Sequence, residues 1–195
     1  MKMAIQLITA PTIEPVTYQQ VIDHLRINSF DEAIDESSIE YIDNLISAVR
    51  RLTEDYLNRA LITQTWEYYL DEFPDVNYIV LPKPPLQSIT SICIITEDEP
   101  ETIDPIYYLV DTASFRGKLV LNADQSWPTQ ILYEMNPIHI TFVCGYGDLA
   151  EDVPAGIRHA ILLQVGDLWD NREDYREVKL SKTSEKLLWP YRVFC

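Results

Sequence analysis

Three histidines are the side chains in this sequence best suited to proton transfer or to metal binding. They are His24, His139 and His159, and no two of them stand four residues apart, the spacing of a helical metal site. His139 alternates with Ile138 and Ile140 in a strand-like run, so we expect its side chain to point away from the core. All three histidines are therefore predicted to be surface residues without a metal.

The cysteines and glycines also lack the patterns of known catalytic sites. Cys93, Cys144 and Cys195 are far apart, odd in number and free of any CxxC pairing, which argues against a disulfide framework or a zinc site. Cys144 has no basic neighbour in the sequence to stabilise a thiolate. The 5 glycines form no P-loop, GxGxxG or GxSxG motif. We predict no enzymatic activity, no metal and no cofactor.

The charge balance limits the kinds of partner. The chain has 15 basic and 31 acidic residues, a formal net charge of −16. Proteins that grip nucleic acid neutralise phosphates with lysine and arginine, so tight DNA binding is not expected. A solvated acidic surface that aids solubility is the simplest interpretation.

Length and composition indicate one domain over residues 1–195, because a chain of this size can bury a full core. Hydrophobic residues make up 47% of the chain, too many for disorder, and no apolar run is long enough to span a membrane. The start, MKMAIQLITAP, lacks the apolar core and cleavage site of a secretory signal. A reducing compartment is expected from the unpaired cysteines.

Residues 38–57 carry the strongest helical pattern, because their apolar residues recur every three or four positions. Ser37 and Glu40 have the spacing of a capping box, and Asn58 stands where a left-handed C-cap residue is expected. Burial of such a stripe stabilises by roughly 1.5 to 3 kcal/mol per side chain, so the helix must pack against a partner.

The other segments predict a mixed fold. Thr17 and Gln20 form a second capping-box pair ahead of a short helix, and Asp152 and Pro154 mark the start of a C-terminal helix over 153–173. Between them lie six strand-like runs, with a hairpin expected at Pro74-Asp75. We therefore predict an α+β fold, a helical bundle with an inserted, mainly antiparallel β subdomain. It comprises an N-terminal helical region (residues 1–62), the β insertion (63–147), the C-terminal helix (148–177) and the tail (178–195).

The tail combines three lysines with an apolar, aromatic end, LLWPYRVF. Trp, Tyr and Arg are enriched at interface hot spots, which favours docking onto another subunit. Folding back onto its own core is an equally good interpretation at this point.

The order of these features resembles the phage head-tail connector (adaptor) family, gp6-like, and in particular its longer phiE125 gp8-like branch with a β insertion. The similar pieces, covering nearly the whole chain, are a prolyl arm before a helix ending in HLR, YLNRALITQTWEYYLDEFP, LPKPPLQSITSI, a solitary WP, ITFVCGYGD, VPAGIRHAILLQVGDLWDNRE and LLWPYRVF. Asn58 departs from the glycine expected there, although it can adopt the same left-handed geometry.

The resemblance implies a structural protein of the virion neck, assembled in the bacterial host cytoplasm. Such a protein forms a ring, with twelvefold symmetry expected, that lies below the portal, extends the DNA channel and contacts stopper or tail proteins. DNA would pass through an acidic channel without specific binding. Interface residues are expected on the C-terminal helix and tail, namely Trp169, Arg172, Tyr175, Leu187, Leu188, Trp189, Tyr191 and Arg192.

Two other functions remain open at the sequence level. One is a different neck component, such as a stopper or tail-completion protein, although the two amphipathic helices disfavour the β-barrel expected there. The other is an acidic module that mimics DNA or sequesters a basic partner, which predicts a stable monomer.

Overall fold

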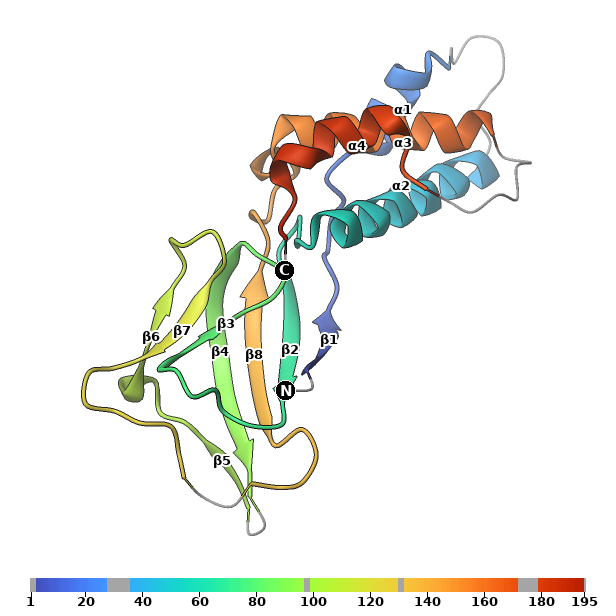
Figure 1. Cartoon of the computed structure of the whole chain (residues 1–195). Helices are drawn as coiled ribbons and strands as arrows, with labels where there is room; N and C mark the ends of the chain where they lie inside the picture. The colour runs from blue at the N-terminus through green and yellow to red at the C-terminus, as the bar shows by residue number, and fades with distance from the viewer. Residues whose placement is uncertain (1–2, 28–35, 97–98, 130–131, 172–178, 195) are drawn as a thin grey trace. The chain divides into compact units, whose positions relative to one another are not determined.

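The structure is a computed structural model that describes residues 3–27, 36–96, 99–129, 132–171 and 179–194. These residues fold into two compact units, one made of strands and one of helices (Figure 1). The β unit comprises Met1–Pro11 and Thr63–Tyr146, and the helical unit comprises Thr12–Ile62 and Gly147–Cys195. The predicted α+β class is confirmed.

The β unit contains two antiparallel sheets. The larger has the order β1-β2-β8-β4-β5, formed by Met3–Thr9, Gln64–Leu70, Ile138–Cys144, Leu86–Ile95 and Pro100–Thr102. The smaller has the order β3-β7-β6, formed by Tyr78–Val80, Lys118–Leu121 and Tyr108–Asp111, and a 3₁₀ turn, η1 (Pro105–Tyr107), precedes β6. All six predicted strands are present, and β1 and β5 are two further strands that the sequence analysis did not predict.

The core of the β unit follows from strand alternation. Ile138, Ile140 and Phe142 on the central strand β8 are fully buried, whereas the residues between them are half-exposed. The smaller sheet contributes Leu119, also fully buried. Gly117 precedes β7 where a Cβ atom would lie 2.3 Å from the Leu86 Cβ, so only glycine fits there. His139 lies on the other, half-exposed side of β8, as predicted.

The hairpin predicted at Pro74-Asp75 is wrong. It would pair β2 with β3, but β2 belongs to the five-stranded sheet and β3 to the three-stranded one. The partner of β2 on one side is β1, from the start of the chain, and on the other side is β8. Long-range pairing therefore replaces the local hairpin that the turn residues favoured.

The helical unit contains α1 (Tyr18–Leu25), α2 (Glu36–Leu57), α3 (Ala155–Asp170) and α4 (Lys182–Leu188). The predicted packing of the two long helices is confirmed, because α2 and α3 lie against each other (Figure 1). Ile42, Ile46 and Val49 of α2 are buried, as are Ile157 and Ile161 of α3. No helix among the described residues is long and apolar enough to cross a membrane.

The helix ends agree with the sequence in several places. Thr17 and Gln20 form the predicted capping box, and Asn58 has the predicted left-handed backbone, with φ of 53°. Ser37 lies inside α2, which begins at Glu36, so Ser37 is not its N-cap. The C-terminal helix begins at Ala155, after a 3₁₀ turn, η2 (Ala150–Asp152), and the structure describes it to Asp170.

Candidate interface at the C-terminal segment

The segment after residue 178 contains a helix that the sequence did not predict. Ser181 caps α4 by accepting a hydrogen bond from the Ser184 amide at 3.2 Å. The helix packs against α3, where the Ser184 hydroxyl donates to the Ala160 carbonyl at 3.2 Å. The Ser181 amide also donates to Oε1 of the buried Gln164 at 2.7 Å. These bonds fix α4 within the helical unit.

Hydrogen bonds to main-chain carbonyls join the last residues to the end of α2. The Val193 amide donates to the Leu57 carbonyl at 2.9 Å, and Asn58 Nδ2 donates to the Val193 carbonyl at 3.0 Å. Arg59 Nε donates to the Tyr191 carbonyl at 2.6 Å. Leu188 and Val193 are buried, which means that the segment supplies a share of its own unit's core. Leu188 and Val193 therefore fold back onto the core of their own unit. For the exposed side chains of the segment, docking onto another subunit stays a prediction.

An aromatic cluster surrounds Arg192 at this junction. The Arg192 Cζ atom lies 4.7 Å from the ring centroid of Tyr56 and 5.3 Å from that of Phe194. The Trp189 and Phe194 rings meet edge to face, with centroids 5.4 Å apart. Trp189 is 56% exposed and Phe194 is 61% exposed. We call Tyr56, Trp189, Arg192 and Phe194 the aromatic cluster.

The predicted interface residues divide into four groups. Trp189 and Arg192 belong to the aromatic cluster, and the half-buried Tyr191 lies beside it in η3 (Trp189–Tyr191). Leu188 is buried and Leu187 half-buried within the helical unit. Trp169 lies on α3, where its ring contacts that of Tyr41 with centroids 5.9 Å apart.

Arg172 and Tyr175, the fourth group, lie outside the described residues. Tyr56 and Phe194 were not among the predicted interface residues. Tyr56 is a half-buried residue within the helical pattern of residues 38–57, and no local pattern links it to residues far along the chain.

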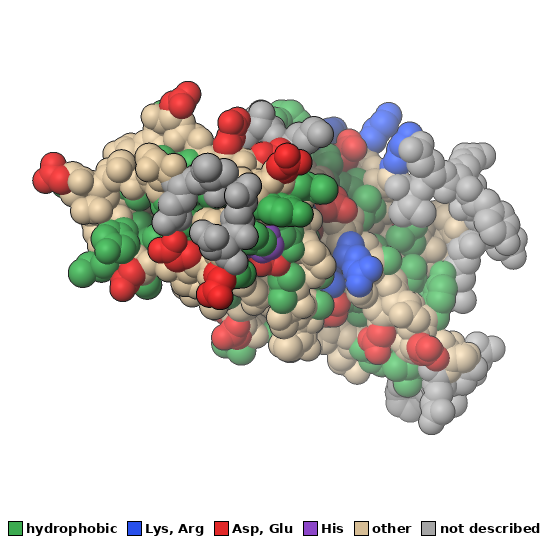
Figure 2. Space-filling view, turned by 90° about the horizontal axis from the view of Figure 1, so that it is seen from below, with side chains coloured by type: hydrophobic (Ala, Val, Ile, Leu, Met, Phe, Trp, Pro, Cys, Tyr) green, Lys and Arg blue, Asp and Glu red, His purple; other side chains and the backbone are tan. Residues whose placement is uncertain are grey.

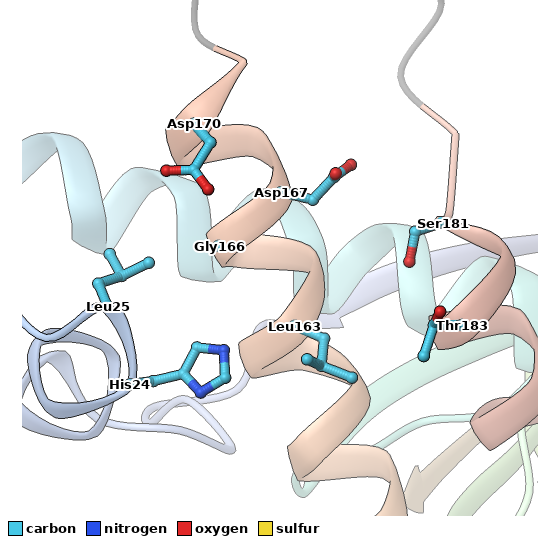
Figure 3. A pocket seen from close by; sticks show the side chains of 8 residues that line it. All are labelled: His24, Leu25, Leu163, Gly166, Asp167, Asp170, Ser181 and Thr183. Atoms are coloured by element: carbon cyan, nitrogen blue, oxygen red, sulfur yellow. The ribbon is translucent and has the colours of Figure 1, made fainter.

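A pocket of about 470 Å³ lies between α1, α3 and the start of α4 (Figure 3). Its lining includes His24 from α1, and Asp167 and Asp170 from α3. The two carboxylates point to different sides of α3 in Figure 3, away from a common centre. Among the described residues no group of histidine, cysteine and acidic side chains could hold a metal ion.

A polar network on the half-exposed side of the large sheet has the only strongly shifted tyrosine pKa among the described residues. The Tyr69 hydroxyl donates to Glu67 Oε2 at 2.5 Å, and this hydrogen bond, with burial and the Glu67 charge, raises the pKa of Tyr69 to about 12. His139 Nδ1 lies 3.4 Å from Glu67 Oε1, and its Nε2 lies 3.0 Å from the Asn136 carbonyl oxygen. Raising that pKa makes the phenol a poorer proton donor, so the network fits a structural role.

The surface of the described residues agrees with the acidic composition. Figure 2 views the molecule from below and shows acidic side chains spread over the nearer surface, with hydrophobic side chains between them. The formal net charge of −16 therefore coexists with exposed apolar positions.

Chains in three solved structures of gene transfer agent (GTA) particles share this fold. One is described as the virion of the native GTA particle, with a TM-score of 0.75 and 17% sequence identity. The others are described as the neck of the empty GTA particle computed with C6 symmetry (0.73, 17%) and the neck of the native GTA particle computed with C12 symmetry (0.69, 18%). Each match covers 98% of this chain and 96% of the other chain.

No protein-family model and no curated protein sequence matches the chain. At 17–18% identity the likeness to the GTA particle chains establishes the fold, over nearly the full length of both chains.

Proposed function

We propose that this protein is a structural component of the neck of a phage-like particle, and specifically a head-tail connector (adaptor). It assembles as a ring below the portal, extends the DNA channel and joins the capsid to stopper or tail proteins. The observation that carries the proposal is the likeness, over 98% of the chain, to chains of GTA particle structures that include two necks. A match over only part of the chain would not support the proposal, because many proteins share a helix pair or an antiparallel sheet.

Symmetry of the related particle supports a ring of twelve copies. The native GTA neck was computed with C12 symmetry and the empty one with C6 symmetry. A ring needs surfaces that join neighbouring copies and a further surface that joins the next component of the neck. We assign the second role to the aromatic cluster, since Trp189 and Phe194 are exposed while the backbone around them is fixed by hydrogen bonds. Preorganised aromatic and arginine side chains are typical of interface hot spots.

The net charge supports a channel through which DNA moves without specific binding. An acidic wall repels phosphates, and the repulsion decreases as salt screens it. The assembled ring is expected to show no retention of double-stranded DNA at low salt. Measurable retention, by filter binding or gel shift, would contradict this aspect of the proposal.

The decisive experiment is electron microscopy and native mass spectrometry of the protein with and without its cognate portal protein. The expected result is a ring on the portal, in which twelve copies are present. A protein that stays monomeric with the portal and binds a basic protein instead would contradict the proposal and favour an acidic binding module.

The role of the aromatic cluster needs point substitutions rather than truncation. Deletion of residues 187–195 would remove Leu188 and Val193 from the core and so confuse docking with folding. The double change Trp189→Ser and Phe194→Ser alters two exposed side chains, and we expect at least about a tenfold loss of portal binding. Phe115→Ser is the matched control, because Phe115 is 61% exposed in the β unit. Equal portal binding by both variants would show that the cluster does not dock.

A further inference from the structure

The first strand forms an uncovered edge of the five-stranded sheet. β1 pairs with β2 on one side, and no described strand pairs with its other side. Ile5, Leu7 and Ile8 are 37%, 38% and 50% exposed. Natural edge strands are usually protected by charged residues, proline or bulges. Apart from a register shift between Leu7 and Thr9, β1 has none of these, and residues 3–13 contain no charged side chain. We call residues 3–9 the uncharged edge.

The opposite side of the β unit exposes apolar side chains together with acidic ones. β5 is the other edge of the same sheet, and the chain continues from it through η1 into β6, an edge of the smaller sheet (Figure 1). This segment, residues 99–111, exposes apolar side chains, with Ile106 at 70% and Leu109 at 62%. It also carries the acidic residues Glu99, Glu101 and Asp104, all exposed. We call residues 99–111 the acidic edge.

The strand register places the start of the uncharged edge and β5 of the acidic edge at the same position along the strand direction. Met3 pairs with Leu70, which pairs with Ile138, and Ile138 in turn pairs with Ile94, the partner of Glu101. One row of residues therefore crosses all five strands, from the start of the uncharged edge to β5 in the acidic edge. In the sequence Lys2 precedes the uncharged edge, and Glu97 and Asp98 precede the acidic edge.

Charge explains why a second copy fits these edges. Copies of a chain with net charge −16 repel each other wherever acidic surfaces meet. The uncharged edge is free of that repulsion, and it offers apolar side chains and backbone groups to the apolar positions of the acidic edge. Two acidic edges cannot meet without like-charge repulsion, and a contact between two uncharged edges would join only two copies. A ring of more copies therefore requires a contact between unlike edges.

We propose that the uncharged edge of one copy contacts the acidic edge of the next copy around the ring. The inference rests on the proposed function, which requires a ring. Because the two edges are different surfaces on opposite sides of the β unit, the contact is head-to-tail and every copy uses both of its edges. Such contacts close into a ring when the rotation between neighbours is constant and divides a full turn.

Single-edge variants test the contact with the full-length chain. Ile8→Glu places a carboxylate on the uncharged edge, opposite the acids of the neighbour, and Leu109→Glu removes the most exposed apolar side chain of β6. Wild-type chains are expected to associate in sedimentation experiments at concentrations up to about 1 mM, and each variant alone to associate at least about tenfold more weakly. Val76→Glu, at a 46% exposed position between β2 and β3, is the matched control and should associate like wild type.

Mixing the variants distinguishes a head-to-tail contact from any other. An Ile8→Glu chain keeps its acidic edge and a Leu109→Glu chain keeps its uncharged edge, so an equal mixture is expected to form dimers that do not grow further. The inference is overturned if wild-type chains remain monomeric over this range, if the mixture stays monomeric, or if either variant alone associates like wild type.

The portal experiment separates this inference from the proposed function. Rings that form equally well on the portal with both variants would overturn the edge contact and leave the connector role standing. Wild-type chains that associate through the two edges but never assemble with the portal would contradict the connector role and leave the edge contact standing.

Discussion

Arg50 and Glu54, one helical turn apart on α2, form an ion pair of 2.8 Å between side chains that are only 6% and 8% exposed. Arg50 Nε also donates to Glu14 Oε2 at 2.7 Å, in the segment ahead of α1. Glu54 Oε1 accepts a hydrogen bond from the Leu61 amide at 2.9 Å. The Arg50 guanidinium therefore connects the segment ahead of α1 to α2, and Glu54 extends this connection to the turn that follows α2.

The first prediction concerns that guanidinium. Arg50→Met would remove the cation that Glu14 shares with the buried Glu54, and breaking a buried pair costs about 3–5 kcal/mol. We expect a loss of unfolding free energy in this range, measured by urea denaturation at neutral pH. Arg51→Met, at the exposed neighbouring position, is the matched control. Equal stability of the two variants would show that the pair contributes little.

The second prediction concerns pH. Burial raises the pKa of Glu14 above its ordinary value of 4.5, and the adjacent Arg50 only partly offsets this effect. Because the folded state holds this proton more tightly than the unfolded state, Glu14 contributes stability that is complete below pH 4.5 and is lost as pH rises through the raised pKa. Relative to Glu14→Gln, wild type should therefore lose unfolding free energy as pH rises through this window. A difference between the two proteins that stays constant or grows with pH would contradict the prediction.

The third prediction concerns the contact between α3 and the C-terminal segment. A Cβ atom at Gly156 would lie 2.9 Å from the Tyr191 hydroxyl oxygen, so Gly156→Ala must displace the end of that ring. Alanine is otherwise favoured over glycine in a helix by up to about 1 kcal/mol. We expect Gly156→Ala to be more favourable in a Tyr191→Ala background than in wild type, by at least about 0.5 kcal/mol. Chemical denaturation of wild type, the two single variants and the double variant measures this coupling. Equal effects of Gly156→Ala in the two backgrounds would show that the Tyr191 ring does not contact position 156.

Local signals in the sequence predicted the elements that depend on local interactions. Thr17 and Gln20 form a cap because both partners are three residues apart, and Asn58 adopts a left-handed backbone because its side chain tolerates it. Most of the six predicted strands are likewise rich in β-branched and aromatic residues. The signals that predicted these elements lie in nearby residues, although the pairing of the strands does not.

Long-range pairing accounts for the elements that sequence reasoning missed. The Pro74-Asp75 turn suggested a hairpin, but β2 pairs with strands that are distant in sequence. The seven residues of α4 are mostly polar, and the helix packs on α3 through Ser184, a residue that no apolar pattern can reveal. The aromatic cluster joins Tyr56 to Arg192, across most of the chain, so its membership could not be read from the tail alone.

Both units are assembled from two separate stretches of chain, and this has a consequence for the order of folding during synthesis. The β unit has all of its residues once Tyr146 has been made, whereas the helical unit needs the residues up to Cys195. Since domains generally fold as units, the strands can reach their native arrangement on the ribosome while α2 still lacks α3. The apolar stripe of α2 then lacks the helix α3 until residues 63–146 have been translated. That nascent stage is where we expect molecular chaperones to bind.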